Sequence, residues 1–238
     1  MQSVKGKIVL VTGATGGIGS QTVKLLVGSG AIVYITGRNL AKLNQLAEAC
    51  RISSDHVFQM DIADEVSVNR VIDNILAQSS VIDILVNATG MGIIKPMESL
   101  SSDDFQKIIQ TNLMGAFYLV KAVLPSMKIQ KKGLIINIPG ILGKVPMAGA
   151  AAYSASKYGL VGMMQSIREE IKRTEIRITN LFLGGVDSPF WDTIDLRVQK
   201  EKMIQAEEAA KAIWFLCQQP VSGVVSEMVL QPFNHQAI

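Results

Sequence analysis

The feature of this chain that most restricts its fold is a regular alternation between short apolar runs and longer segments of helical periodicity. The first two runs read KIVLVT and AIVYIT, and similar runs recur into the C-terminal quarter. Runs that stay apolar on both faces are typical of strands covered by helices on both sides. Strands that alternate with helices predict a parallel sheet with right-handed crossovers.

The alternation extends over the whole sequence without an internal repeat or a linker. A chain of 238 residues is an ordinary length for one domain. We therefore expect a single Rossmann-like α/β domain over residues 1–238, a doubly wound parallel sheet with helices on both faces. The expected strands cover residues 7–12, 31–36, 56–60, 82–87, 134–138, 177–182 and 224–230. The expected helices cover residues 18–27, 40–50, 65–77, 103–127, 153–173 and 206–217. The least regular stretch, 184–205, is interpreted as a flap over the functional site.

Composition argues against several classes of protein. Hydrophobic residues make up 48% of the chain, but no run reaches the roughly 18 uncharged apolar residues of a spanning helix, so we expect no membrane association. The net charge of +3 comes from Lys and Arg scattered among acids, which argues against nucleic-acid binding. The N-terminus enters a strand without a cleavable apolar segment.

The candidate metal ligands are few and far apart. Cys50 and Cys217 form neither a disulfide framework nor a zinc-ligand spacing, and His56 and His235 lack a third ligand. We therefore expect no metal site, two structural or exposed histidines, and a reducing, cytoplasmic location.

A glycine-rich turn follows the first expected strand. Ligands of doubly wound sheets bind at the carboxyl ends of the strands, so this position is a candidate for function. Glycines let the backbone approach a phosphate, and the following helix offers free N–H groups and a partial positive charge. A tight turn without a ligand is the alternative, since the spacing departs from GxGxxG. The predicted dinucleotide site comprises Gly13, Thr15, Gly16, Gly17, Ile18 and Gly19.

The second expected strand is followed by Thr36-Gly37-Arg38. A site that reads the ribose 2′-hydroxyl of NAD presents Asp or Glu here. Arg38 instead offers a permanently charged fork for a phosphate, which favours NADP(H) over NAD(H). An exposed loop arginine without a ligand is the alternative.

The stretch YSASK places Tyr153 and Lys157 four residues apart, on one face of an expected helix. A nearby ammonium favours the phenolate and moves a tyrosine towards useful acid/base chemistry. A half-buried tyrosine beside a lysine without catalytic function is the alternative for this pair taken alone.

Several motifs in order give the chain a wider resemblance. TGATGGIG at 12–19, Asp61, NATG at 87–90, Asn112, YSASK at 153–157 and GGVDSP at 184–189 are arranged as in the short-chain dehydrogenase/reductase family, which the chain resembles over nearly its whole length. The resemblance implies hydride transfer between a nicotinamide and a carbonyl or alcohol carbon, with Tyr153 giving or taking the proton. It also implies that Lys157 holds the nicotinamide ribose and lowers the pKa of Tyr153, while Asn112 positions a water. Further cofactor contacts implied by it are Asp61, Ile62, Asn87, Gly90, Val186 and Ser188.

The chain departs from the family's pattern at one important position. The family's catalytic serine lies thirteen residues before the tyrosine, which is Gly140 here, and no Ser or Thr occurs from Ile138 to Ala152. Loss of one donor to a developing oxyanion costs about 2.7–4 kcal/mol, against a total enzymatic effect of roughly 8–23 kcal/mol. The reaction would be slowed rather than abolished. A backbone N–H, a water or a substrate hydroxyl could replace the donor, or the pocket could suit a substrate that needs none.

The favoured function is an NADP(H)-dependent carbonyl reductase acting on a small molecule, with an NADP(H)-binding sensor or scaffold of weak or no turnover as the alternative. The helices at 103–127 and 153–173 carry apolar residues beyond one stripe, which favours a homodimer or homotetramer. The candidate substrate lining is apolar and comprises Met91, Ile141, Met147, Phe190 and Trp191.

Overall fold

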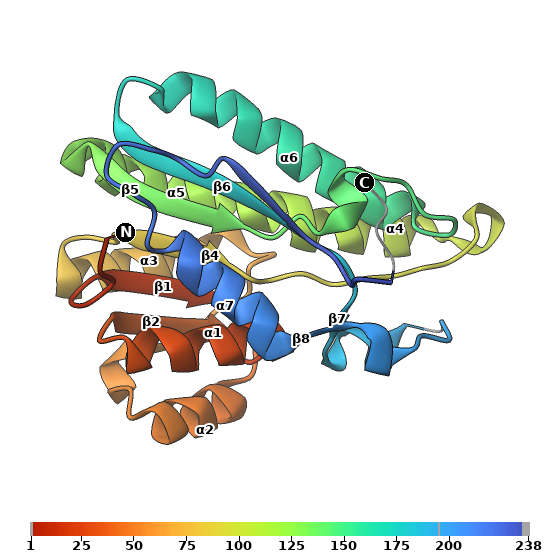
Figure 1. Cartoon of the computed structure of the whole chain (residues 1–238), viewed down its shortest axis with the longest axis horizontal. Helices are drawn as coiled ribbons and strands as arrows, with labels where there is room; N and C mark the ends of the chain where they lie inside the picture. The colour runs from red at the N-terminus through yellow and green to blue at the C-terminus, as the bar shows by residue number, and fades with distance from the viewer. Residues whose placement is uncertain (1, 195, 235–238) are drawn as a thin grey trace.

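A computed structural model describes residues 2–194 and 196–234 of the chain, which leaves His235 outside the described residues. These residues form a seven-stranded sheet in the order β3-β2-β1-β4-β5-β6-β9, with every neighbouring pair parallel (Figure 1). The expected doubly wound sheet is confirmed, and strand order reverses between β1 and β4. The strands are β1 (Ile8–Thr12), β2 (Ile32–Gly37), β3 (Val57–Gln59), β4 (Ile84–Asn87), β5 (Lys132–Asn137), β6 (Glu175–Leu183) and β9 (Glu227–Leu230).

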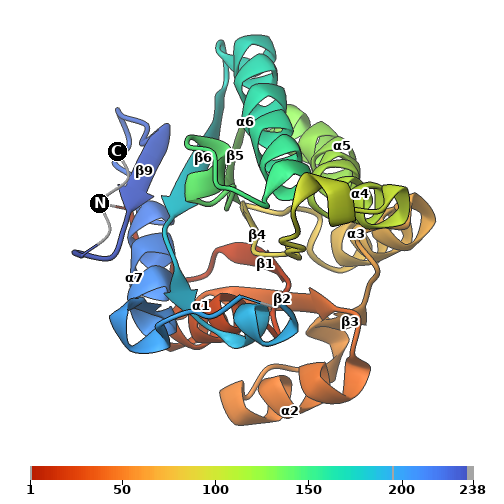
Figure 2. The same ribbon diagram turned by 90° about the vertical axis from the view of Figure 1, so that its right-hand side faces the viewer.

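Helices cover both faces of the sheet (Figure 2). On one face, α1 (Gly17–Gly28), α2 (Leu40–Cys50) and α7 (Ala206–Leu216) pack onto side chains such as Val9 and Val86. On the other, α3 (Glu65–Ser79), α5 (Gly115–Gln130) and α6 (Ala151–Ile171) pack onto side chains such as Leu10 and Leu85. Successive strand residues therefore enter different cores, which explains why the strands read as continuous apolar runs.

A row of polar side chains crosses the carboxyl ends of the central strands. Thr12, Asn87, Asn137 and Asn180 are paired in register on β1, β4, β5 and β6. The Thr12 hydroxyl donates to Asn87 Oδ1 at 3.1 Å, and Asn87 Nδ2 donates to Asn137 Oδ1 at 3.2 Å. These buried bonds hold the ends of β1, β4 and β5 level, so the loops that leave these three strands start from a common edge.

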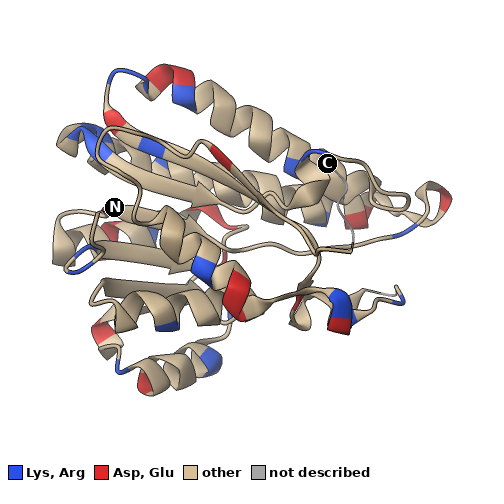
Figure 3. Ribbon diagram, in the orientation of Figure 1, with Lys and Arg blue, Asp and Glu red and all other residues tan. Residues whose placement is uncertain are grey.

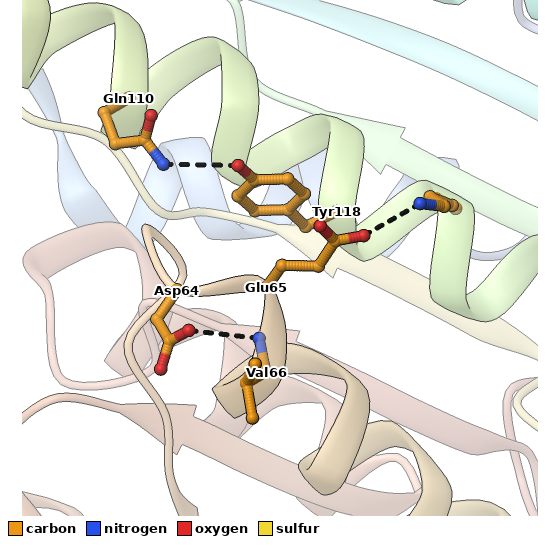
Figure 4. A network of polar contacts seen from close by, with 6 residues as sticks. Asp64, Glu65, Val66, Gln110 and Tyr118 are labelled. Carbon is orange, nitrogen blue, oxygen red and sulfur yellow. Dashed lines mark hydrogen bonds and ion pairs between the residues drawn. The ribbon is translucent and has the colours of Figure 1, made fainter.

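The segment expected as one regular helix over 103–127 is interrupted. It consists of α4 (Ser102–Ile109), a π-helical turn (Gln110–Met114) and α5. Gln110 Nε2 donates to the Ala63 carbonyl at 2.7 Å and lies 3.4 Å from the Tyr118 hydroxyl (Figure 4). An ion pair of 2.8 Å joins Glu65 of α3 to Lys121 of α5. These contacts fix the π turn against the loop after β3.

The same segment, Ser102–Gln130, is the one helix among the described residues that is long and apolar enough to cross a membrane by length and composition. Its apolar face packs into the core against the sheet, through Ala116, Leu119, Val120, Val123 and Met127. The absence of a membrane association stays a prediction.

The stretch 184–205 has short structure of its own beyond the carboxyl ends of the strands (Figure 1). β7 (Val186–Asp187) pairs with β8 (Ile204–Gln205), and two 3₁₀ helices, Pro189–Thr193 and Lys200–Lys202, lie between them. Lys, Arg, Asp and Glu are interspersed along this flap and over the helices (Figure 3).

Candidate active site

A cleft of about 1120 Å³ opens at the carboxyl ends of the strands, between the glycine-rich turn, the loop after β5 and the flap. Nine of the predicted site residues line it: Gly16, Gly17, Ile18, Gly19, Gly90, Tyr153, Lys157, Val186 and Ser188. Four of the five residues predicted as apolar lining, Ile141, Met147, Phe190 and Trp191, also border it.

The glycine-rich turn is closed so tightly that side chains are excluded. Gly13 has φ of 66°, in the left-handed region, and a Cβ on it would lie 2.8 Å from the Ala88 carbonyl oxygen. A Cβ on Gly19 would collide with the Gly13 carbonyl, and one on Gly17 would lie 2.7 Å from Ser188 Cβ. No side chain caps the N-terminus of α1 at Gly16, and no acid occupies its first turn. The turn is therefore a backbone cradle with N–H groups available to an anion.

Tyr153 and Lys157 lie one turn apart near the N-terminus of α6, and both line the cleft. Lys157 is 3% exposed, and its ammonium donates to the Ile138 carbonyl at 3.0 Å. The ammonium lies 5.5 Å from the centre of the Tyr153 ring. The predicted juxtaposition of phenol and ammonium is present, and the ammonium also ties α6 to the loop after β5.

Burial dominates the electrostatics of this pair. It raises the pKa of the Tyr153 phenol above its ordinary value and lowers the pKa of Lys157 to about 8. The expected lowering of the Tyr153 pKa by Lys157 is not seen in this structure, in which burial of the phenol sets the direction of the shift. A neutral phenol is the form suited to donating a proton.

Gly140 lies beside the phenol. A Cβ on Gly140 would be 3.8 Å from the Tyr153 hydroxyl oxygen and 3.6 Å from the Leu183 carbonyl oxygen, so no described atom fills the place of its side chain. Its backbone has φ of 71° and ψ of 170°, a conformation that is essentially restricted to glycine. Gly140, at the position that corresponds to the family's serine, therefore has room for a side chain, but its backbone conformation disfavours one.

Asn112 bridges two parts of the site. Within the π turn, its Oδ1 accepts the Met91 N–H at 2.9 Å and its Nδ2 donates to the Met91 carbonyl at 2.9 Å. Nδ2 also lies 3.1 Å from Ser156 Oγ, which itself donates to the Tyr153 carbonyl at 2.7 Å. The amide thus joins the loop after β4 to α6, and Ser156 is a link that the sequence pattern did not single out.

The remaining predicted cofactor residues lie outside the cleft lining. Arg38 is exposed after β2, and the Thr15 hydroxyl lies 3.5 Å from the place a Cβ on the adjacent Gly37 would take. Asp61 Oδ1 accepts the Ala63 N–H at 3.0 Å. Ile62 is buried, and a Cβ on Gly115 would lie 2.8 Å from its Cγ1, so its side chain belongs to the core. The side chain of Asn87 is hydrogen-bonded to Thr12 and Asn137 in the row of polar side chains.

The histidine and thiols have structural surroundings. The His56 ring packs 4.2 Å from the Tyr34 ring, centre to centre, and both cysteines are free thiols. Within residues 2–194 and 196–234, no group of three His, Cys, Asp or Glu side chains could hold a metal ion.

Comparisons with solved structures match the whole fold. A metagenomic short-chain oxidoreductase in complex with NADP is 28% identical, with a TM-score of 0.84 over 97% of this chain and 99% of that chain. A serine dehydrogenase complexed with NADP⁺ in its closed form is 27% identical, with a TM-score of 0.88 over 96% of each chain.

Sequence comparisons give the same result. An oxidoreductase of Staphylococcus saprophyticus, itself uncharacterized, is 31% identical over 98% of both chains. The family model described as short chain dehydrogenase matches residues 7–199, which include the glycine turn, Tyr153 and Lys157. The chain therefore belongs to the short chain dehydrogenase family and is an oxidoreductase by descent.

Proposed function

We propose that this protein is an NADP(H)-dependent carbonyl reductase of small molecules. The observation that carries the proposal is one cleft lined by both a side-chain-free phosphate cradle and the Tyr153–Lys157 pair. A dinucleotide fits the cradle because a Cβ at Gly17 or Gly19 would fill it and because the first N–H groups of α1 are uncapped. When bound, the nicotinamide supplies the hydride.

The side chains of this protein supply the proton and the positioning. Tyr153 stays protonated through burial and donates its proton to the carbonyl oxygen. The Lys157 ammonium lies close enough to stabilise the tyrosinate that follows, and it would hold the ribose hydroxyls of a bound nicotinamide cofactor. Asn112 holds Met91 and Ser156, and through them the cleft wall and α6. The apolar lining excludes water from the reacting carbon.

The preference for NADP(H) over NAD(H) rests on Arg38. No hydrogen bond or ion pair to a described residue engages its guanidinium, and Gln59 Nε2 bonds its backbone carbonyl at 2.9 Å, which fixes the loop. With Thr15 beside Gly37, a hydroxyl and a guanidinium flank the end of β2. This pair suits a 2′-phosphate. The solved relatives bound to NADP support the same choice.

The test is NADPH oxidation with a panel of ketones and quinones. Tyr153→Phe removes the proton donor and is expected to lower kcat/KM by about 10²–10⁴, with NADPH affinity unchanged. Tyr158→Phe is the matched control, since Tyr158 is on the same helix and is 44% exposed. A wild-type rate no higher than that of Tyr153→Phe across the panel would defeat the proposal.

That result would favour the second candidate, an NADP(H)-binding sensor or scaffold. The observation on its side is the glycine-only backbone at Gly140, which removes a donor from the site. Tight NADPH binding in calorimetry without turnover is its signature.

We also propose that the protein is cytoplasmic and assembles as a homodimer or homotetramer. Phe105, Phe117 and Tyr158 are large apolar or aromatic side chains exposed on α4, α5 and α6. Sedimentation velocity is the test, and a monomer at micromolar concentration would contradict the assembly.

A further inference from the structure

The space beside Gly140 is a defined vacancy in the cleft wall. It is bordered by the Tyr153 hydroxyl and the Leu183 carbonyl oxygen, at 3.8 Å and 3.6 Å from the position of an added Cβ. Both bordering atoms are polar, and all three residues line the cleft. Burying an alkyl group against a phenol and a carbonyl leaves those groups without partners, which is unfavourable. The space therefore suits a small polar group.

A carbonyl oxygen that becomes an alkoxide accepts more than one hydrogen bond, and Tyr153 supplies one. The loop that carries Gly140 has no side-chain hydroxyl. Three other donors that line the cleft, on Thr89, Trp191 and Lys157, are engaged elsewhere. Thr89 Oγ1 bonds Thr12 Oγ1 at 3.0 Å, Trp191 Nε1 bonds the Val186 carbonyl at 2.9 Å, and Lys157 bonds the Ile138 carbonyl. The second lone pair of the reacting oxygen lacks a side-chain donor from this loop.

We propose that the substrate brings this donor itself, as a hydroxyl on the carbon next to the carbonyl, seated in the space at Gly140. The proposal rests on the proposed function and names its substrate class, the α-hydroxy ketones. A hydride adds to the carbonyl carbon, the π electrons of the C=O bond move to oxygen, and that oxygen takes the proton of Tyr153. The substrate hydroxyl keeps its proton: it donates a hydrogen bond to the Leu183 carbonyl oxygen before hydride transfer, and turns towards the developing alkoxide as charge builds on that oxygen.

The rest of the cleft indicates the body of the substrate. Phe190 packs edge-on to Tyr153 with ring centres 6.0 Å apart, and Trp191 packs edge-on to Phe190 at 5.3 Å. An aromatic or other flat apolar group fits beside these rings. Aryl α-hydroxy ketones are therefore suitable probes.

The experiment compares 2-hydroxyacetophenone with 2-methoxyacetophenone in NADPH oxidation by the wild-type protein. The second ketone carries O–CH₃ where the first carries O–H, so it keeps the oxygen but cannot donate a hydrogen bond, and the rates of reduction by borohydride correct for intrinsic reactivity. The expected ratio of corrected kcat/KM values is about 100 in favour of the hydroxy ketone, carried mainly by kcat. A ratio below about three overturns the inference and leaves the proposed function standing. Reduction of neither ketone above the Tyr153→Phe background, nor of any other carbonyl in the panel, overturns the proposed function and the inference with it.

Two further measurements test the proposed seat: the first needs no turnover, and the second changes the loop at Gly140. In the Tyr153→Phe variant with NADPH, quenching of tryptophan fluorescence reports binding beside Trp191, and the hydroxy ketone is expected to bind about fivefold more tightly. Equal binding of the two ketones counts against the proposed seat. In Gly140→Ala the added methyl group occupies the space, so the hydroxy preference is expected to fall below about tenfold. An undiminished preference would place the hydroxyl elsewhere.

Discussion

The glycines of the turn after β1 and Gly140 border the same cleft, but they lack a side chain for different reasons. In the turn after β1, a Cβ on Gly19 would collide with the Gly13 carbonyl, and one on Gly17 would lie 2.7 Å from Ser188 Cβ. At Gly140, a Cβ would meet nothing nearer than 3.6 Å, and only the backbone conformation excludes a side chain. In the turn after β1, packing leaves no room for a side chain. Beside Gly140 there is room for one, and only the backbone conformation excludes it.

The difference indicates how one fold can keep its cofactor site constant while its substrate site varies. A cradle with no spare space suits a cofactor of constant shape. The space next to Tyr153, the proposed proton donor, suits a ligand that completes the site with its own atoms. Substitutions at Gly19 and at Gly140 test this difference.

The largest effect is expected from Gly19→Ala. Because its Cβ would meet backbone rather than a movable side chain, the turn or α1 must shift. We expect a loss of about 3 kcal/mol in the free energy of unfolding, measured by urea denaturation. Gly28→Ala is the matched control in the same helix, since a Cβ there meets nothing within 4 Å, and it should be neutral or slightly stabilising. Equal effects of the two changes would show that the turn is not closed by packing.

Gly140→Ala is expected to lose about 1–3 kcal/mol in the same measurement, through backbone strain. Gly6→Ala is the control, because Gly6 also has positive φ, 74°, and a Cβ there meets nothing within 4 Å. Both variants should lose stability, but only Gly140→Ala should change the ratio of rates on hydroxy and methoxy ketones. If Gly140→Ala is as stable as the wild type, the backbone account of this position is wrong.

Arg38→Asp tests the nucleotide side without touching the turn. We expect NADPH to bind at least tenfold more weakly and NADH to bind about as before, because the 2′-phosphate loses a charge-assisted partner and meets a like charge. Arg70→Asp, an exposed charge reversal on α3, is the control for net charge. Equal weakening of both nucleotides in calorimetric titration would show that Arg38 does not read the phosphate.

The smallest effect concerns the buried ammonium on the substrate side. Lys157 has a pKa of about 8 in the folded chain, against 10.5 as its ordinary value, so between these values the unfolded chain binds more protons. Stability then rises with pH, since the full penalty of burying the charge applies below pH about 8. From pH about 7.5 to 9, the free energy of unfolding of the wild type should rise by about 1 kcal/mol relative to Lys157→Met. A constant difference between the two proteins would show that the ammonium is not desolvated.

The strands and helices could be predicted from the sequence because each has a local pattern that its burial on both sheet faces enforces. The interruption at Gln110–Met114 could not, since the bonds that hold it, from Gln110 to the Ala63 carbonyl and from Asn112 to Met91 and Ser156, join residues distant in sequence. The last strand begins at Glu227 rather than 224, because apolar residues before it pair with no neighbouring strand.

The candidate site divides in the same way. The glycine turn, Tyr153 and Lys157 were predictable because short motifs place them after strands or on one helix face. The raised pKa of Tyr153 was not, because it depends on how deeply the surrounding elements bury the phenol. Nor does a sequence show the sign of φ at Gly140, which decides whether a side chain can be accommodated beside Tyr153.

The backbone at Gly140 also bears on how such a site can change over generations. A single exchange of Gly140 for serine would put a hydroxyl on a conformation that disfavours any side chain, so the loop would have to be remodelled at the same time. Two changes that are useful only together rarely accumulate one by one. Substitutions in the flap need no change of backbone conformation at Gly140, so they are a shorter route to a new specificity than a side chain at Gly140.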